Sequence, residues 1–340
     1  MNEKKLAFYV FLSLFFFGFF YDLGFSSEYK LVIDTEGRRV KIPSKVERVV
    51  VLTGTCIETI YILGEINKVV GISKPVVESP FISKLIKELR KIPIVAQDLK
   101  NVDLEKILAL KPDLIIGIGP EHPFGMSSEL VKKFEKLRIP LILLNLENLS
   151  ENYYSIELLG QIFNQEKKAK ELVSYMKNIV NHVVSKTSKI PYDKRVKALM
   201  LSQKPNLVLG GYWKEQDLIF LAGGINVASE IKEFVAEVPL EKILLWNPEI
   251  ITIVGSAPYQ PEDLLNNPQL KSIKAIKEKK VYKYPLEITG LFTPRVVLLL
   301  AWHAAKFYPE LKINWTKIAD EFFKKFYKIS YQNILSLTSK

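Results

Sequence analysis

The sequence predicts an α/β protein of two parallel-sheet lobes that are joined by a single long helix, with a ligand cleft between the lobes. Three observations favour this fold. Short runs of Val, Ile and Leu alternate with amphipathic segments in each half of the chain, as in parallel sheets covered by helices. A proline-free stretch with helical spacing of apolar residues separates the halves. A seventeen-residue unit occurs once in each half.

The N-terminal segment, residues 1–26, has the composition of a secretory signal peptide. Lys4 and Lys5 precede an apolar run over residues 6–21, and Gly24-Phe25-Ser26 provides a small-x-small cleavage pattern. The run is shorter than the ~20 residues that cross a bilayer comfortably. We therefore expect export to the periplasm or the outer face of the cytoplasmic membrane, with an uncleaved N-terminal anchor as the alternative.

The first lobe is expected over residues 28–150. A hairpin-like lead-in covers residues 29–42, and the alternation of strands and helices follows it. Predicted strands lie at 49–52, 69–72, 114–118 and 141–144, and predicted helices lie at 57–63, 79–90, 104–110 and 128–137.

The bridging helix is expected over residues 151–188. This stretch has no proline and only one glycine, Gly160, and it ends before Ile190-Pro191. One helix of that length would extend ~50 Å at 1.5 Å per residue. The second lobe then occupies residues 190–340, with strands near 196–201, 207–209, 250–254 and 281–284 and helices near 216–222, 240–246, 268–276, 294–307 and 315–327.

An internal repeat supports the division into two lobes. Residues 103–119 (DLEKILALKPDLIIGIG) align with residues 239–255 (PLEKILLWNPEIITIVG) at a constant offset, and eight of the seventeen positions are identical. Each copy reads as a short helix, a proline-containing turn and a buried strand. Glu105 and Glu241 occupy matching positions near the helix starts. A first-turn carboxylate stabilises a helix by itself, but the duplication favours a paired role at the surface.

The composition limits the functional classes. The net charge is +11, yet the basic residues are scattered along amphipathic helices, so we expect no nucleic-acid partner. The single cysteine, Cys56, cannot form an internal disulfide and reads as a small buried hydrophobe. We expect no enzyme, because no nucleophile elbow, phosphate-binding loop or dinucleotide fingerprint follows a strand. An exported α/β enzyme using Glu121 and His122 as a titrating pair is the alternative from another class.

Candidate ligand-binding residues lie at the carboxyl ends of the predicted strands, where open α/β sheets bind their ligands. Thr53-Gly54-Thr55 follows the first strand, and its backbone N–H groups are suited to an anion, or Thr53 simply caps a helix. Glu121 and His122 lie in a Gly/Pro loop after the strand at 114–118. The second lobe adds Gln203, Lys204, Tyr212, Trp213, Ser256, Tyr259 and Arg295.

These candidates favour a cargo that bears an anion. Arg295 suits bidentate contact with such a ligand, and Tyr212 and Trp213 suit a flat or apolar one, although Trp213 alternatively anchors the core. No histidine pair, cysteine pair or dense acidic cluster provides a cage for a bare metal, so no metal site is predicted. We expect no resident cofactor, a transported metal chelate or oxyanion, and a monomeric protein.

The chain resembles the class III periplasmic substrate-binding proteins of ABC importers over about residues 48–309. The motifs that carry this resemblance are Arg48-Val-Val-Val-Leu52, Val70-Gly-Ile-Ser73, Asn101-Val-Asp-Leu-Glu105, Lys111-Pro-Asp-Leu-Ile115, Gly223-Gly-Ile-Asn-Val227, Pro239-Leu-Glu-Lys-Ile243 and Thr293-Pro-Arg295. They are specific in combination and weak alone.

The resemblance implies delivery of an iron complex (siderophore or haem), cobalamin or a related metal-containing ligand to a membrane permease. The tail of the chain looks closest to a branch whose ligands include metal complexes and molybdate or tungstate, which gives the alternative cargo. The resemblance also implies a rigid helix between the lobes and docking of Glu105 and Glu241 onto permease arginines. In this family the residue that matches Arg295 can also be structural.

Overall fold

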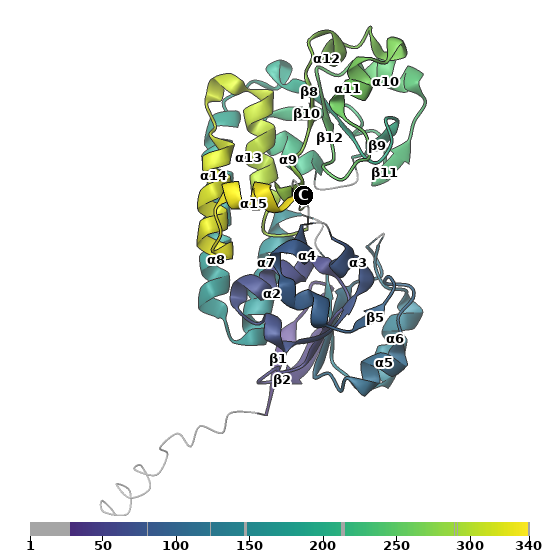
Figure 1. Ribbon diagram of the computed structural model, residues 1–340, viewed down its shortest axis with the longest axis vertical. Helices are drawn as coiled ribbons and strands as arrows, with labels where there is room; N and C mark the ends of the chain where they lie inside the picture. The colour runs from purple at the N-terminus through teal and green to yellow at the C-terminus, as the bar shows by residue number, and fades with distance from the viewer. Residues whose placement is uncertain are drawn as a thin grey trace, which may run out of the picture.

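The computed structural model describes residues 28–340 except 80, 123, 146–147, 212–214, 289, 291 and 339–340. The predicted signal peptide, Tyr212 and Trp213 therefore lie outside the described residues. Two α/β lobes stand one above the other, with a layer of helices along one side of both (Figure 1). This arrangement confirms the predicted fold class. None of the described helices combines the length and hydrophobicity that crossing a membrane requires.

The N-terminal lobe is built on a five-stranded parallel sheet in the order β5-β4-β3-β6-β7. Its strands are β3 (Val49–Val51), β4 (Val69–Ser73), β5 (Ile94–Ala96), β6 (Leu114–Ile118) and β7 (Leu141–Leu144). Its helices are α2 (Gly54–Leu63), α3 (Lys74–Glu78), α4 (Ile82–Leu85), α5 (Leu104–Ala109) and α6 (Ser128–Lys136), with 3₁₀ turns at Ile66–Lys68 and Lys87–Lys91. Because the strand order reverses between β3 and β6, the loops that follow these two strands flank a topological switch point.

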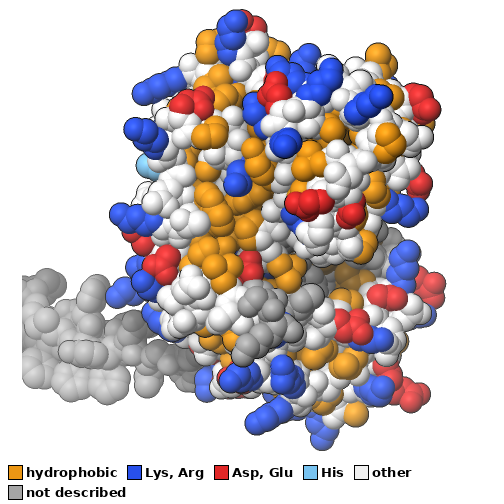
Figure 2. Space-filling model, turned by 45° about the horizontal axis from the view of Figure 1, so that its top comes forward, with side chains coloured by type: hydrophobic (Ala, Val, Ile, Leu, Met, Phe, Trp, Pro, Cys, Tyr) orange, Lys and Arg blue, Asp and Glu red, His pale blue; other side chains and the backbone are white. Residues whose placement is uncertain are grey.

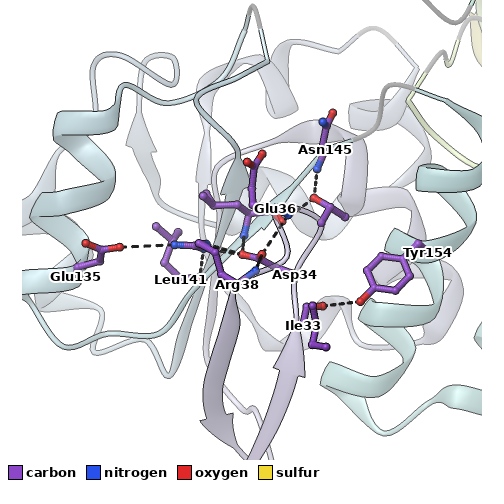
Figure 3. A network of polar contacts seen from close by, with 10 residues as sticks. Ile33, Asp34, Glu36, Arg38, Glu135, Leu141, Asn145 and Tyr154 are labelled. Carbon is purple, nitrogen blue, oxygen red and sulfur yellow. Dashed lines mark hydrogen bonds and ion pairs between the residues drawn. The ribbon is translucent and has the colours of Figure 1, made fainter.

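A hairpin of β1 (Tyr29–Ile33) and β2 (Arg39–Pro43) is attached to the β7 edge of this sheet by a buried carboxylate (Figure 3). Asp34 is 1% exposed and pairs with Arg38 at 2.6 Å, and its Oδ2 accepts from the Leu143 N–H at 3.1 Å. Arg38 also donates to the Leu141 carbonyl at 2.8 Å. The hairpin loop thereby reaches the carboxyl end of the sheet. There, a Cβ on Gly119 would displace the Glu36 carboxylate, which is the flexible end of that side chain.

The predicted bridging helix over 151–188 is wrong in one respect, because the structure contains two helices there. Helix α7 (Leu149–Phe163) ends at Asn164, which adopts the left-handed conformation with φ 56°, and α8 (Glu166–Thr187) then begins. Asparagine tolerates this conformation and commonly terminates helices. The helices pack closely where Gly160 meets Ala169. Helix α8 alone, ~33 Å long at 1.5 Å per residue, continues to the second lobe.

The C-terminal lobe contains a mixed sheet in the order β11-β9-β8-β12-β13, with β10 also pairing with β8. Strand β9 runs antiparallel to β8 and β11, which corrects the expectation of a wholly parallel sheet. The strands are β8 (Val196–Leu201), β9 (Leu207–Leu209), β10 (Gly224–Asn226), β11 (Val235–Glu237), β12 (Ile250–Ile253) and β13 (Val281–Lys283). The helices are α9 (Glu215–Leu221), α10 (Leu240–Trp246), α11 (Pro261–Leu265), α12 (Lys274–Lys277), α13 (Val296–Phe307), α14 (Trp315–Phe322) and α15 (Tyr331–Thr338), with a π-helical turn at Phe323–Tyr327 and 3₁₀ turns at Tyr192–Lys194, Pro268–Leu270, Leu286–Ile288 and Pro309–Leu311.

The C-terminal helices belong to both lobes, which the predicted domain limits did not anticipate. Phe323 contacts the Phe81 ring of the first lobe at 6.1 Å between centroids, and Tyr327 stacks on Tyr61 at 6.2 Å. Helix α15 lies level with the junction of the lobes (Figure 1) and contacts α4. The lobes are therefore braced twice, by α8 and by the segment from α14 to α15.

Candidate functional site

The candidate ligand site is a pocket of about 280 Å³ where the two lobes meet. The first lobe contributes Gly54, Thr55 and Ser79 to its wall, and the second lobe contributes Phe292, Thr293 and Arg295. Figure 2 shows a hollow between the upper and lower parts of the molecule, on the right of the view. The pocket adjoins the carboxyl end of β3, as expected for an open α/β sheet.

The N-terminus of α2 forms one wall of this pocket. Thr53 is the N-cap, and its hydroxyl accepts from the Thr55 N–H at 3.3 Å and lies 2.9 Å from the Thr55 hydroxyl. Thr53 is buried, whereas Gly54 and Thr55 line the pocket. The N-cap interpretation is therefore confirmed, whereas the anion-binding interpretation stays a prediction, with a helix start and its partial positive charge at the wall of the cavity.

The loop after β6 places His122 against the other lobe. His122 is 4% exposed, and its Nδ1 accepts from the Phe124 N–H at 3.1 Å. Its ring lies 5.7 Å from the Phe292 ring, and Phe124 lies 5.5 Å from Phe234, so two aromatic contacts cross the junction of the lobes. Glu121 is exposed at the surface of the same loop. The sequence did not identify these phenylalanines as site residues, because their contacts join distant segments.

Arg295 lies in the pocket wall, but its guanidinium is engaged by a residue that the sequence analysis missed. Its Nε and Nη2 donate to the two carboxylate oxygens of Glu58, each at 2.7 Å, and Nη1 donates to the Glu287 carbonyl. Tyr327 donates to Glu58 at 2.6 Å. Arg295 is 3% exposed, and this burial disfavours its charged form. The charge of Glu58 and its hydrogen bonds to the guanidinium outweigh burial, so that the pKa of Arg295 is raised.

The Glu58–Arg295 pair changes the expected role of Arg295. A guanidinium that is held bidentately by a carboxylate brings no net positive charge to the pocket. The pair instead joins helix α2 of the first lobe to the segment before α13 of the second. Glu58 lies within a helix of otherwise apolar and small residues (GTCIETIYIL), and that isolated charge was the available sequence signal.

The other second-lobe candidates form a separate cluster. Gln203 donates to the Ser256 hydroxyl at 3.0 Å, and Tyr259 donates to the Ser202 carbonyl at 2.9 Å. Lys204 pairs with Glu237 at 3.1 Å. Within the described part of the chain, these bonds stay inside the second lobe and none of the four candidates lines the pocket. Burial raises the pKa of Tyr259, so its hydroxyl remains a donor.

Glu105 and Glu241 lie in the first turns of α5 and α10, and both are exposed. The two helices occupy the far ends of the lobes on the same side of the molecule, opposite α8 and α14 (Figure 1). Both copies of the repeat end their helix with a left-handed residue, Lys111 (φ 47°) and Asn247 (φ 44°). The duplication seen in the sequence is therefore also a duplication of backbone structure.

In each copy, the lysine that follows the glutamate is bound by a different carboxylate. Lys106 pairs with Asp103 at 3.1 Å, and Lys242 pairs with Glu230 at 2.6 Å. Among the described residues, no side chain forms an ion pair or hydrogen bond with the carboxylate of Glu105 or Glu241. Both glutamates thus present unpaired charges to solvent.

The described residues contain no group of three or more His, Cys, Asp or Glu side chains that could hold a metal ion. Cys56 is buried and free, and burial raises its pKa to about 12, so its thiol stays protonated. Figure 2 shows basic side chains interspersed with acidic ones over that face instead of forming one block. Neither the thiol nor the charge pattern of this face indicates a second site.

Comparison with known proteins identifies the family. The sequence profile of the periplasmic binding proteins matches residues 49–287. The chain belongs to this family. The match agrees with the predicted resemblance and with the expected absence of enzymatic activity, since the relatives are solute-binding proteins of ABC transporters.

Several relatives match most of this periplasmic binding protein. The molybdate-binding protein MolA of Haemophilus influenzae is 26% identical over 89% of this chain and 92% of its own. A vitamin B12-binding protein of Vibrio vulnificus is 23% identical over 75% of this chain and 88% of its own. The structure of MolA bound to molybdate has a TM-score of 0.79 at 24% identity and covers 89% of this chain and 99% of its own. A periplasmic solute-binding protein from Veillonella parvula has a TM-score of 0.78 at 25% identity and covers 92% and 99%.

Proposed function

We propose that this binding protein carries a tetrahedral metal oxyanion of the molybdate and tungstate class in the pocket between its lobes. The observation that carries the proposal is the N-terminus of α2, where Gly54 and Thr55 line the pocket. Helix N-termini bind anions through free backbone N–H groups and the helix dipole. Thr55 adds a hydroxyl group to the wall, whereas the hydroxyl of Thr293 already donates to the Gly290 carbonyl at 3.1 Å. Similarity to MolA, which is named for molybdate binding, agrees with this cargo.

The charge and the size of the pocket support a small oxyanion. Glu58 compensates Arg295, so an anion would be held by neutral N–H and O–H donors rather than by a free cation. The volume of about 280 Å³ lies at the lower limit of pockets that hold drug-sized ligands, roughly 300–1,000 Å³. A tetrahedral oxyanion is smaller than such a ligand, whereas cobalamin and haem are larger. Carrying either would require the lobes to separate.

Replacing Thr55 with valine is expected to weaken molybdate binding at least about tenfold, because a lost hydrogen bond to a charged group costs about 1.5–3 kcal/mol. Calorimetric titration of residues 28–340 measures this effect. Thr316→Val is the matched control, because Thr316 is also the second residue of a helix but lies in α14, outside the pocket. Failure of the unaltered protein to bind molybdate or tungstate would exclude the proposed cargo.

A compact metal chelate is the second candidate, and the aromatic contacts across the lobe junction favour it. Phe292 lines the pocket and contacts the His122 ring of the other lobe, which places a flat apolar surface at the wall, as suits the organic part of a chelator. The same titration with a ferric siderophore, haem and cobalamin tests this alternative. Tight binding of a ferric siderophore together with no heat from molybdate would favour the chelate over the oxyanion.

We also propose that Glu105 and Glu241 dock the protein onto arginines of its permease. Two separated, unpaired carboxylates on one side of the molecule fix orientation and accelerate encounter. We propose further that the protein acts as a monomer without a resident cofactor. Residues 1–26 would direct its export and be removed, and N-terminal sequencing of the exported protein distinguishes removal from an uncleaved anchor.

Exchanging both glutamates for glutamine is expected to abolish most uptake and to leave ligand affinity unchanged. The carboxylates are exposed at the far ends of the lobes and therefore do not contact the pocket. Uptake of labelled ligand and calorimetric affinity, measured on the same variant, test the two halves of this expectation. Glu262→Gln, at the first turn of α11, is a control for a helix-start glutamate. Normal uptake by the double variant would refute docking through these residues.

A further inference from the structure

Each lobe carries an exposed leucine beside its unpaired glutamate. Leu245 is 77% exposed, the highest value among the large hydrophobic side chains of the described residues, and Leu108 is 43% exposed. Leu245 lies four residues after Glu241, and Leu108 lies three residues after Glu105. Residues three or four apart share one face of a helix. A carboxylate and a leucine therefore form a patch on α5 and another on α10, which we name the N-patch (Glu105, Leu108) and the C-patch (Glu241, Leu245).

Folding does not account for these leucines. A leucine that remains exposed gains little from burial in the protein's own core. Single exposed leucines are common on protein surfaces. These two are different because each lies beside the unpaired carboxylate of its own copy of the repeat, although at neighbouring and not equivalent positions, since Leu108 aligns with Leu244.

The neighbouring side chains keep both patches open. Glu230 accepts from Lys242 and, at 2.9 Å, from the Trp246 indole N–H, which directs both residues to one side of α10. Asp103 holds Lys106 in the other lobe. With each lysine paired to another carboxylate, its ammonium group does not pair with the glutamate.

We propose that the C-patch and the N-patch are mixed docking surfaces, and that Leu245 and Leu108 insert into apolar depressions of the permease beside the arginines that receive the glutamates. This inference rests on the proposed docking of Glu105 and Glu241. The carboxylates supply attraction at a distance, and the leucines supply contact that salt does not screen. The C-patch contributes more, because Leu245 has more surface left to bury.

The patches are also unequal in a way that distinguishes the lobes. At the position of Leu245 the N-terminal copy has Ala109, which is also exposed. A permease depression that accommodates Leu245 would be only partly filled by Ala109. The bound orientation is thereby fixed, since exchanging the two lobes would leave apolar surface unmatched.

The test measures how tightly the processed protein binds a permease–ATPase complex in nanodiscs. The complex is selected beforehand as one that binds the unaltered protein. Leu245→Ser is expected to weaken binding at least about tenfold, because the variant loses the free energy of burying a leucine side chain in the contact. Leu108→Ser should weaken it less. Leu31→Ser is the matched control, because Leu31 is 66% exposed but lies in β1, away from both patches.

The salt dependence of binding distinguishes contact by the leucines from docking by the glutamates. The defect of Leu245→Ser should persist at 0.5 M salt, whereas the defect of Glu105→Gln/Glu241→Gln should shrink as salt screens the charges. Unaltered affinity of Leu245→Ser beside a defective glutamate variant would overturn the inference and leave charge docking standing. Unaltered affinity of both variants would overturn docking itself. Loss of a self-associated dimer in Leu245→Ser, measured by sedimentation, would show that a second copy of this chain covers the leucine and would also overturn the inference.

Discussion

Replacing Arg295 with alanine is expected to lower the free energy of unfolding by about 3–5 kcal/mol. The substitution leaves the Glu58 carboxylate buried at 0% exposure without its guanidinium partner, at the junction of the two lobes. It also removes the cation that lies 4.3 Å from the centre of the Phe81 ring. Urea-induced unfolding followed by fluorescence measures the change.

A second variant distinguishes two free energies: the destabilisation caused by leaving one buried charge unpaired, and the net contribution of the intact pair to stability. Replacing all three members, by Glu58→Met, Arg295→Met and Tyr327→Phe, removes the buried charges and the hydroxyl that donates to Glu58. This triple variant is expected to recover most of the lost stability, because apolar replacements of buried ion pairs are often neutral. Lys133→Ala, which breaks an exposed pair with Glu129, should cost less than about 1 kcal/mol. Stability of Arg295→Ala close to that of the unaltered protein would show that the pair is not a brace between lobes.

Acidification is expected to destabilise the protein through His303 by about 3–5 kcal/mol between pH 7 and pH 3. His303 is fully buried in α13, with ring centroids 5.2 Å from Tyr284 and 5.4 Å from Phe307. Burial lowers the pKa of His303 from 6.5 to about 3. Neither ring nitrogen reaches a hydrogen-bond partner among the described residues.

The direction of the effect follows from proton uptake. In the unfolded chain His303 binds a proton below about pH 6.5, whereas in the folded protein it stays neutral down to about pH 3. The contribution of the neutral imidazole to the free energy of unfolding is therefore fully present above pH 6.5, and it is lost as the pH falls from about 6.5 to about 3.

Denaturant unfolding of His303→Phe at several pH values tests this expectation. The variant keeps an aromatic ring and should lose a matching part of the pH dependence. His182→Phe is the control, because His182 is exposed on α8. Parallel pH profiles of the His303 variant and the unaltered protein would contradict the assignment.

Part of the site could be predicted from the sequence, because the apolar pattern locates the strands and the order of strands in the sheet determines which of the loops that follow them lie close together. Thr53-Gly54-Thr55 follows β3 and His122 follows β6, and the switch in strand order between β3 and β6 brings these loops to one edge of the sheet. Of these residues, Gly54 and Thr55 line the pocket. Gln203, Lys204, Ser256 and Tyr259 also follow strands, yet the described structure joins them to one another and not to the pocket. A loop at the end of a strand is thus a candidate by position, and its orientation decides whether it lines the pocket.

The sequence by itself determined the α/β alternation, the two lobes and the matched glutamates, because these depend on apolar periodicity and on a repeat that can be read along one chain. Only the tertiary structure decided that Arg295 would meet Glu58, 237 residues away, and that Tyr327 would close the same network. It also decided that α7 and α8 fold into a pair at Asn164 and that β9 runs antiparallel. These features depend on contacts between distant segments, and their free energy arises from burial that no local pattern records.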